Sequence, residues 1–188
     1  MSLVLERVKG SDSVSIMGLD DIAEAPPLQG ERLTLEPLRI DHADEMAPLL
    51  DDPALHTFIG GKTATLQELR GRYAEQIVGQ PPDGSQLWLN WIVRRRDDGQ
   101  AVGFVQATIS EHNRELNAEV AWVVAVSQQH SGYAREAAQL MADWLRQQHV
   151  HQVVAHVHPH HHTSYAVARS IGLAPTDIQV DGEVRWQG

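Results

Sequence analysis

The sequence contains no cysteine, and this absence removes several kinds of chemistry at once. Disulfide-stapled scaffolds, cysteine-ligated zinc sites and thiol nucleophiles are all excluded. Lysine is nearly absent too, since Lys9 and Lys62 are the only two among 15 basic residues. The formal net charge is −10, which argues against a nucleic-acid partner or an acidic membrane, because proteins that bind either one need a basic surface.

Long apolar runs are missing as well. No stretch approaches the roughly 18 residues that a membrane span requires, and the first ten residues lack the apolar core and cleavage site of a secretory leader. We therefore expect a cytoplasmic protein with no membrane partner. With 188 residues, the chain is long enough for one domain with a well-buried core.

The N-terminal residues differ from the rest of the chain. Residues 1–30 show little apolar periodicity, and the pair Pro26-Pro27 is typical of a linker. We predict an N-terminal extension over 1–30, followed by one domain over 31–188.

The domain mixes two apolar periodicities. A repeat of two predicts strands, and a repeat of three to four predicts helices. Strands are expected over residues 32–38, 87–94, 101–109, 118–126, 152–158 and 183–186, and helices over about 42–50, 65–78, 131–148 and 162–171. A strand meander with one strand-helix-strand crossover predicts an α+β (mixed α/β) fold.

The segment 124–134 carries the clearest chemical signal, because it joins an expected strand to an expected helix. The first turn of a helix leaves backbone N–H groups unpaired and carries partial positive charge, so it suits an anion. Gly132 has no Cβ, and Ser131 and Ala134 are small, so phosphate groups have room to approach the backbone. The alternative is a glycine that serves only a tight turn.

The pattern Gln129-x-x-Gly132-x-Ala134 resembles the Q/R-x-x-G-x-G/A signature of the GNAT N-acetyltransferase superfamily. Residues 132–137 most resemble its ribosomal-protein N-terminal acetyltransferase branch, and the likeness covers about residues 30–187. It implies a central, mostly antiparallel mixed sheet with helices on both faces, and acetyl-CoA as the co-substrate. In that family the loop binds the pyrophosphate, and a bulge in the preceding strand presents backbone donors to the thioester carbonyl. The residues thereby implied in coenzyme binding are Val124, Ala125, Val126, Gln129, His130, Ser131, Gly132, Tyr133 and Ala134.

A carboxylate is expected to remove the proton of the acceptor amine, since most amines are protonated at neutral pH. Glu119 interrupts the otherwise apolar stretch 118–124, and several family members place a base on this strand. Glu119 is therefore our candidate base. The alternative is a carboxylate that simply faces water at the edge of a strand.

The departing thiolate needs a proton, and many family members supply it from a tyrosine. The matching position here is Ala168, so the usual acid is absent. The resemblance to the N-terminal acetyltransferase branch assigns Ser164 to this role instead, together with a contact to the coenzyme. His161 stands where the family often has an asparagine that contacts the pantetheine, and it is a further candidate for coenzyme binding. Ser164 alternatively forms a hydrogen bond only near the start of its helix.

The acceptor site is expected between the first two helices and the first long strand. In the family this region forms one wall of the site, and Phe58, Ile59 and Gly60 belong to an expected loop with paired glycines. Trp88 and Trp91 are three residues apart and cannot share one face of a strand. We assign Trp91 to the acceptor wall. The alternative is a plain connection that fills the core.

The histidines between residues 156 and 162 suggest a metal site, but their pattern argues against one. His156, His158 and His160 would share one face of a regular strand. No carboxylate lies in the run, Pro159 interrupts the strand geometry, and the spacing matches no known ligand motif. We expect no metal.

These features predict transfer of an acetyl group from acetyl-CoA to a primary amine by direct attack in a ternary complex. The acceptor is a small-molecule amine or a peptide N-terminus, and a homodimer is left open. The alternative is a catalytically degenerate acyl-CoA-binding domain that acts as a sensor or subunit. The departures at His161 and Ala168 keep that alternative open.

Overall fold

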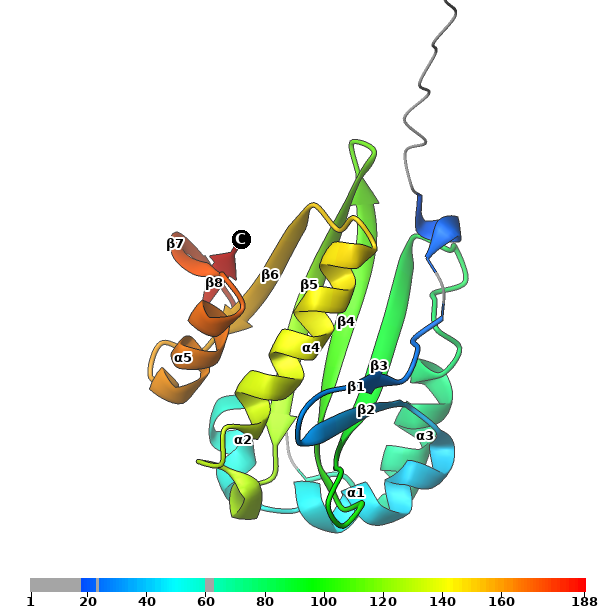
Figure 1. The fold of residues 1–188 in the computed structure, drawn as a ribbon, viewed down its shortest axis with the longest axis vertical. Coiled ribbons are helices and arrows are strands. Elements are labelled where there is room, and N and C mark those ends of the chain that lie inside the picture. The colour runs from blue at the N-terminus through cyan, green and yellow to red at the C-terminus, as the bar shows by residue number, and fades with distance from the viewer. Residues whose placement is uncertain (1–17, 23, 60–62) are drawn as a thin grey trace, which may run out of the picture.

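The computed structural model describes residues 18–22, 24–59 and 63–188, without the side chains of His56, Phe58 and Ile59. Within this part of the chain, eight strands form one sheet in the order β1-β2-β3-β4-β5-β6-β8-β7 (Figure 1). The strands are β1 (Leu28–Gln29), β2 (Leu33–Pro37), β3 (Gln86–Arg95), β4 (Ala101–His112), β5 (Glu115–Val124), β6 (Gln152–Val157), β7 (Ala174–Val180) and β8 (Glu183–Gln187). Neighbouring strands are antiparallel except β5 and β6, which are parallel.

Five α-helices are described, and they cover both faces of this sheet. They are α1 (Ala43–Leu50), α2 (Pro53–Ile59), α3 (Leu66–Gln76), α4 (Tyr133–Gln147) and α5 (His162–Ser170). The predicted mixed α+β class, with a mostly antiparallel sheet and helices on both sides, is therefore confirmed. Helix α2 was not expected, since the sequence favoured a loop there. The expected strand over 118–126 instead runs from Glu115 to Val124, because the turn before it is only two residues long.

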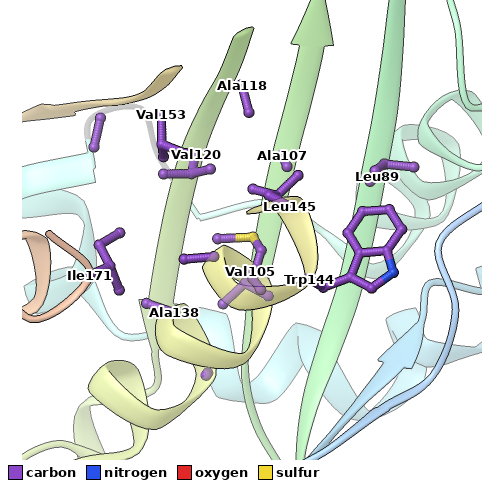
Figure 2. Packing of buried hydrophobic residues seen from close by; sticks show 14 of the residues in the cluster. Leu89, Val105, Ala107, Ala118, Val120, Ala138, Trp144, Leu145, Val153 and Ile171 are labelled. Atoms are coloured by element: carbon purple, nitrogen blue, oxygen red, sulfur yellow. The ribbon is translucent and has the colours of Figure 1, made fainter. Parts of the chain in front are cut away.

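Helix α4 lies diagonally across β4 and β5 (Figure 1). Its apolar stripe includes Ala138, Met141 and Leu145, which are all fully buried. Figure 2 shows Leu145 over Val105 and Ala107 of β4. Burying large aliphatic side chains stabilises a fold by about 1.5–3 kcal/mol each. This layer therefore anchors α4 on the sheet and positions its first turn.

Helices α1 and α3 pack on the opposite face. Met46 of α1 and Leu69 of α3 form a second buried cluster with Ile92 of β3. Strand side chains alternate between faces, so Ile92 points away from the face that α4 covers. This second cluster covers only part of its face, and polar side chains of β3, β4 and β5 occupy the rest.

The described part of the N-terminal extension packs against the domain. Ile22 is buried in the main core, and β1 pairs with β2. The backbone carbonyl of Pro26 accepts a hydrogen bond of 2.7 Å from the indole Nε1 of Trp91. Residues 18–22 and 24–30 therefore contribute to the same folded unit as the strands that follow.

A network of ionic side chains joins β2, β3 and α1 away from the α4 face. Arg94 contacts Glu36 at 2.8 Å and Glu45 at 2.5 Å, and Arg39 also bonds to Glu36. Burial alone would raise the pKa of the Glu36 carboxyl, but hydrogen bonds from Arg39 and Arg94 outweigh it and lower that pKa to about 2. These ion pairs therefore hold α1 against β2 and β3.

Candidate active site

Strands β5 and β6 form a fork, which is the central feature of the site. They pair at Asn117–Glu119 with Gln152–Val154, and the amide of His151 donates to the Leu116 carbonyl at 2.7 Å. Beyond Glu119 and Val154, these two fully described strands are not paired. The C-terminal half of β5 therefore has one backbone edge that β6 does not cover.

The hydrogen-bond alternation of β5 identifies which backbone groups face this fork. Ala125 N donates to Val102 O of β4 at 2.9 Å. In an antiparallel ladder, every second residue bonds to the neighbour and the others point away. The N–H groups of Trp122 and Val124 therefore face away from β4 and toward the fork. The amide of Ala125, which the sequence assigned to the coenzyme, is already used within the sheet.

The expected bulge in this strand is absent. The register between β4 and β5 runs without a shift from Gly103 opposite Val124 to His112 opposite Glu115. A bulge would insert one unpaired residue into this ladder. In this chain, the divergence of β6 frees the edge of β5, so the prediction of a bulge was wrong.

The loop after β5 turns sharply into α4. Val126 begins a 3₁₀ turn that ends at Gln128, and His130 and Gly132 both have positive φ, at 62° and 79°. Among the described residues no side chain caps α4, and its first helical hydrogen bond runs from Glu136 N to Gly132 O. The three amides before Glu136 therefore point out of the helix start, where an anion can accept from them.

Gln129 has a structural task that its place in the motif did not reveal. Its Nε2 donates to the Val124 carbonyl at 3.1 Å. This bond occupies a carbonyl that has no β6 partner, and it fixes the loop against the end of β5. The motif glutamine thus shapes the loop from within as well as lining the cavity described below.

Arg32 and Glu136 hold the loop from the opposite side, and sequence reasoning missed both. The Glu136 carboxylate accepts bonds of 2.8 Å from the backbone N and the Nε of Arg32, and another of 3.1 Å from Leu33 N. Arg32 also donates to the Ser131 carbonyl at 2.8 Å, and its guanidinium lies 5.2 Å from the Tyr133 ring centroid. One signal was available, since an acidic residue in the first turn of a proposed anion-binding helix would repel the anion unless a cation neutralised it.

A cavity of about 410 Å³ lies between the fork, the loop and α5. This volume is in the usual range for small-molecule sites. Of the predicted coenzyme residues, those that line it are Val124, Val126, Gln129, His130, Gly132, Tyr133, Ala134, His161 and Ser164. Ala125 and Ser131 do not line it, and Ala54 and Leu55 of α2 form a wall that sequence reasoning missed.

Ser164 lies in this cavity with two polar partners. Its Oγ is 3.3 Å from Trp122 Nε1, which donates to it, and 3.0 Å from His161 Nδ1. Burial lowers the pKa of His161, and the neighbouring His158 acts in the same direction. A neutral imidazole accepts the Ser164 hydrogen at Nδ1 or donates one from it, depending on the tautomer. Ser164 thus links β5 to α5 across the cavity.

Glu119 lies on the opposite face of the same strand and does not line this cavity. Its side chain is 63% exposed, and Oε1 lies 3.2 Å from Nδ1 of His156 on β6. Trp88, Thr108 and Glu119 form one row across β3, β4 and β5. Adjacent strands are about 4.8 Å apart, so this row spans about 10 Å.

An open hollow of about 710 Å³ borders this row on the face of α3. Its floor includes the side-by-side residues Asn90 and Gln106, and Trp88 and Thr108 also line it. Arg72 of α3 lies on its helical side. The hollow therefore leads along the sheet to the neighbourhood of Glu119.

Of the predicted acceptor wall, one residue is contradicted. Trp91 is fully buried, and its ring packs edge-on against Trp144 with centroids 5.7 Å apart. The alternation of β3 puts Trp91 on the α4 face and Trp88 on the other, so Trp88 borders the hollow instead. Gly60 and the side chains of Phe58 and Ile59 lie outside the described residues.

Among the residues that the structure describes, no group of three or more histidine, aspartate or glutamate side chains is arranged to hold a metal ion. In the same residues, no helix combines the length and apolar character needed to cross a membrane.

A family model described as an acetyltransferase (GNAT) domain matches residues 32–174, which is well over half of the chain. No curated protein sequence matches. The match begins at Arg32, which holds the loop, and includes both strands of the fork.

Solved structures resemble the whole domain. A ribosomal L7/L12 α-N-protein acetyltransferase in complex with coenzyme A has a TM-score of 0.71 at 16% identity, with 87% of this chain and 97% of that chain covered. A Salmonella typhimurium acetyltransferase that modifies the N-terminal serine of L7/L12 has a TM-score of 0.69 at 15% identity, covering 87% and 98%. An Agrobacterium tumefaciens acetyltransferase has 0.66 at 22% identity, covering 89% and 96%.

At 15–22% identity, the solved structures show a shared fold only. The family match, in contrast, is a match of the amino-acid sequence. That match contains the strand β5, the loop with Gln129 and Gly132, and the whole of α4. The same elements enclose the cavity beside the fork. This chain therefore belongs to the GNAT family, the acetyl-CoA-dependent N-acetyltransferases.

Proposed function

We propose that this protein transfers the acetyl group of acetyl-CoA to a primary amine by direct attack in a ternary complex. The observation that carries the proposal is the arrangement of β5. One face and edge of this strand border the cavity, and the other face carries Glu119 beside an open hollow. Coenzyme and acceptor then approach the fork from opposite faces of the sheet and react without an acetylated enzyme.

The coenzyme side uses backbone donors. The amides at the start of α4 bind the diphosphate, and Gly132 keeps their approach open. The N–H groups of Trp122 and Val124, which face the fork, bind the thioester carbonyl. As the amine attacks, the same donors stabilise the negative charge that develops on this oxygen.

The acceptor side uses Glu119. Its carboxylate takes one proton from the ammonium, directly or through water, and leaves a lone pair on the nitrogen. That pair forms the new C–N bond to the thioester carbon, and the C–S bond breaks as the tetrahedral intermediate collapses. The electrons of that bond leave on sulfur, and Ser164 donates a proton to the thiolate and regains one from solvent. The nitrogen loses its remaining extra proton to the medium.

The hollow favours a peptide N-terminus over a polycation. The amide side chains of Asn90 and Gln106 both donate and accept hydrogen bonds, as a peptide backbone does. Trp88, Pro81 and Pro82 add apolar walls, whereas Glu75 is the one carboxylate among the lining residues described. The relatives named for L7/L12 act on a protein N-terminus, which adds support for the same acceptor class in the cytoplasm.

A second candidate function is acyl-CoA binding without catalysis, as a sensor or subunit. The specific observation in its favour is Ala168, which is buried where many family members have their catalytic tyrosine. Under this alternative, Ser164 and His161 only hold the coenzyme. The two functions differ in one measurable property, which is release of free thiol that depends on an amine.

The test combines binding and turnover. Calorimetry measures acetyl-CoA binding, and a thiol reagent follows coenzyme A release with a serine-initiated peptide, its N-terminally blocked copy and a polyamine. We expect binding in the micromolar range and release with the free peptide only. Binding without amine-dependent release would support the sensor, and absence of binding would refute both functions.

A further inference from the structure

The contact between Glu119 and His156 bridges the fork at the point where β5 and β6 separate. Glu119 is the last paired residue of β5, and His156 lies two residues beyond its partner Val154 on β6. The two side chains nevertheless meet, with 3.2 Å between Nδ1 and Oε1. The carboxylate is 63% exposed, whereas the imidazole is only 20% exposed. An exposed carboxylate is therefore held by a mostly enclosed imidazole.

The second ring nitrogen of His156 indicates which tautomer this contact uses. Nε2 is buried and has no hydrogen-bond partner in the described part of the chain. A buried N–H without an acceptor is costly, particularly on a charged ring. The arrangement therefore favours a hydrogen on Nδ1, donated to Glu119. The nearest other charged or titratable residues by pairing and sequence are Arg185, opposite His156 on β8, and His158, which follows the end of β6.

We propose that His156 is a positioning residue for acetyl transfer, in which its Nδ1–H holds one carboxylate oxygen of Glu119 at the fork. The second oxygen then faces the incoming amine and receives its proton. This inference rests on the proposed function. It assigns a role to one of the histidines that the sequence first suggested as metal ligands.

The physical reason is the freedom of an exposed glutamate. A free glutamate side chain loses up to about 2 kcal/mol of rotamer entropy when it is ordered, and this loss would otherwise fall on the reacting complex. A misplacement of about 1 Å can cost on the order of 10²-fold in rate. One hydrogen bond from an anchored ring removes most of that freedom and leaves one oxygen available.

The chain supplies a matched control at the other end of the same two strands. His151, just before β6, lies 3.7 Å from Glu115 of β5, and their side chains are 65% and 57% exposed. This pair has the same residue types, with Glu115 on β5 and His151 one residue before β6, but it lies at the closed end of the fork. Replacing His151 should therefore leave turnover unchanged.

The experiment compares four variants of the full chain, with peptide-dependent thiol release as the assay. His156→Asn keeps a donor nitrogen at the place of Nδ1, His156→Gln moves it to the place of Nε2, and His156→Leu removes it. We expect kcat to stay within about threefold for Asn and to fall about 10- to 100-fold for Gln and Leu. The KM for acetyl-CoA should not change, and His151→Leu should match the wild type.

A double-mutant cycle separates positioning from a general structural role. If His156 acts through Glu119, His156→Leu should lower kcat less than about twofold in a Glu119→Gln background. Equal losses in both backgrounds, or wild-type kcat in His156→Gln, would overturn the inference. If the Leu variant fails to fold, the Asn and Gln pair decides the question. Failure of the wild type to release thiol with any amine would instead refute the proposed function.

Discussion

The two ends of the β5–β6 pair use the same strands for opposite purposes. At the closed end, Asn117–Glu119 and Gln152–Val154 form an ordinary parallel ladder above a buried apolar layer. At the open end, the strands diverge, and Trp122 reaches across to Ser164 of α5. The closed end satisfies its backbone groups within the sheet, whereas the open end leaves some of them for a ligand.

The comparison shows that an interruption in a ladder can serve as a binding device. An unpaired strand edge inside a domain exposes donors at fixed spacing, with no side chain needed. The residues beside this edge need no polar side chains, and Val124, Ala125 and Val126 are all aliphatic. The side chains that we propose to react, Glu119 and Ser164, lie on either side of the opening.

The largest effect at the open end is expected from a side chain added at the start of α4. Gly132→Glu should abolish acetyl-CoA binding, with at least a 10³-fold rise in Kd. A Cβ at this position would lie 3.3 Å from a guanidinium nitrogen of Arg32, φ is +79°, and the new carboxylate would repel the diphosphate. Calorimetry measures the effect. Gly182→Glu, also at positive φ but with nothing within 4 Å, is the control and should bind normally.

The next test compares equivalent glutamates at the two ends. Glu119→Gln should lower kcat by roughly 10²- to 10⁴-fold, the usual span for a lost general base. Higher pH should partly restore the rate, because more of the amine is then already neutral. Glu115→Gln at the closed end should behave as the wild type, and so should acetyl-CoA binding in both variants. An unchanged pH–rate profile in Glu119→Gln would assign the base role elsewhere.

A smaller effect is expected on the thiolate side of the opening. Ser164→Ala should reduce kcat about tenfold, less than the loss of the base, because thiols with pKa near 8.5 already give fair leaving groups. The rate should gain less from raised pH than that of Glu119→Gln. Ser170→Ala, in the same helix but bonded to the Val167 carbonyl, provides the control. Equal rates in the two serine variants would leave Ser164 with a structural role only.

The smallest effect concerns a region outside the fork and should leave the chemistry untouched. Glu36→Gln should destabilise the fold by about 1–3 kcal/mol at neutral pH. The folded pKa of Glu36, about 2, lies below its unfolded value, so its stabilisation is complete above about pH 4.5 and disappears as pH falls toward 2. Urea unfolding at several pH values would measure this loss, with Glu31→Gln as the control. A fall in acetyl-CoA affinity would show that the two regions are coupled.

The sequence predicted the local features of this molecule and missed the relations between distant ones. The positions of Gln129 and Gly132 were enough to locate the loop, because a turn into a helix is a local event. The two faces of β3 could not be told apart from a period of two, so Trp91 was assigned to the wrong side. Helix α2 was missed because seven residues ahead of paired glycines give too little periodicity.

Other parts of the site could not be predicted because they depend on strand register. His156 meets Glu119 only because β5 and β6 pair in one register and then separate. The residue pattern of a single strand predicts neither the register nor the separation. The bond between Arg32 and Glu136 joins residues 104 positions apart. Such contacts follow from the assembled sheet and not from propensity.

The bond between Arg32 and Glu136 also has a consequence for how the chain folds. Closing a loop of this length is slow and entropically costly, so we expect the loop before α4 to take its final shape only after β2 has joined the sheet. Under the proposed function, acetyl-CoA recognises this shape, so it should bind the native state alone and shift the folding equilibrium toward it by mass action. We therefore expect acetyl-CoA binding to report whether the fold is complete.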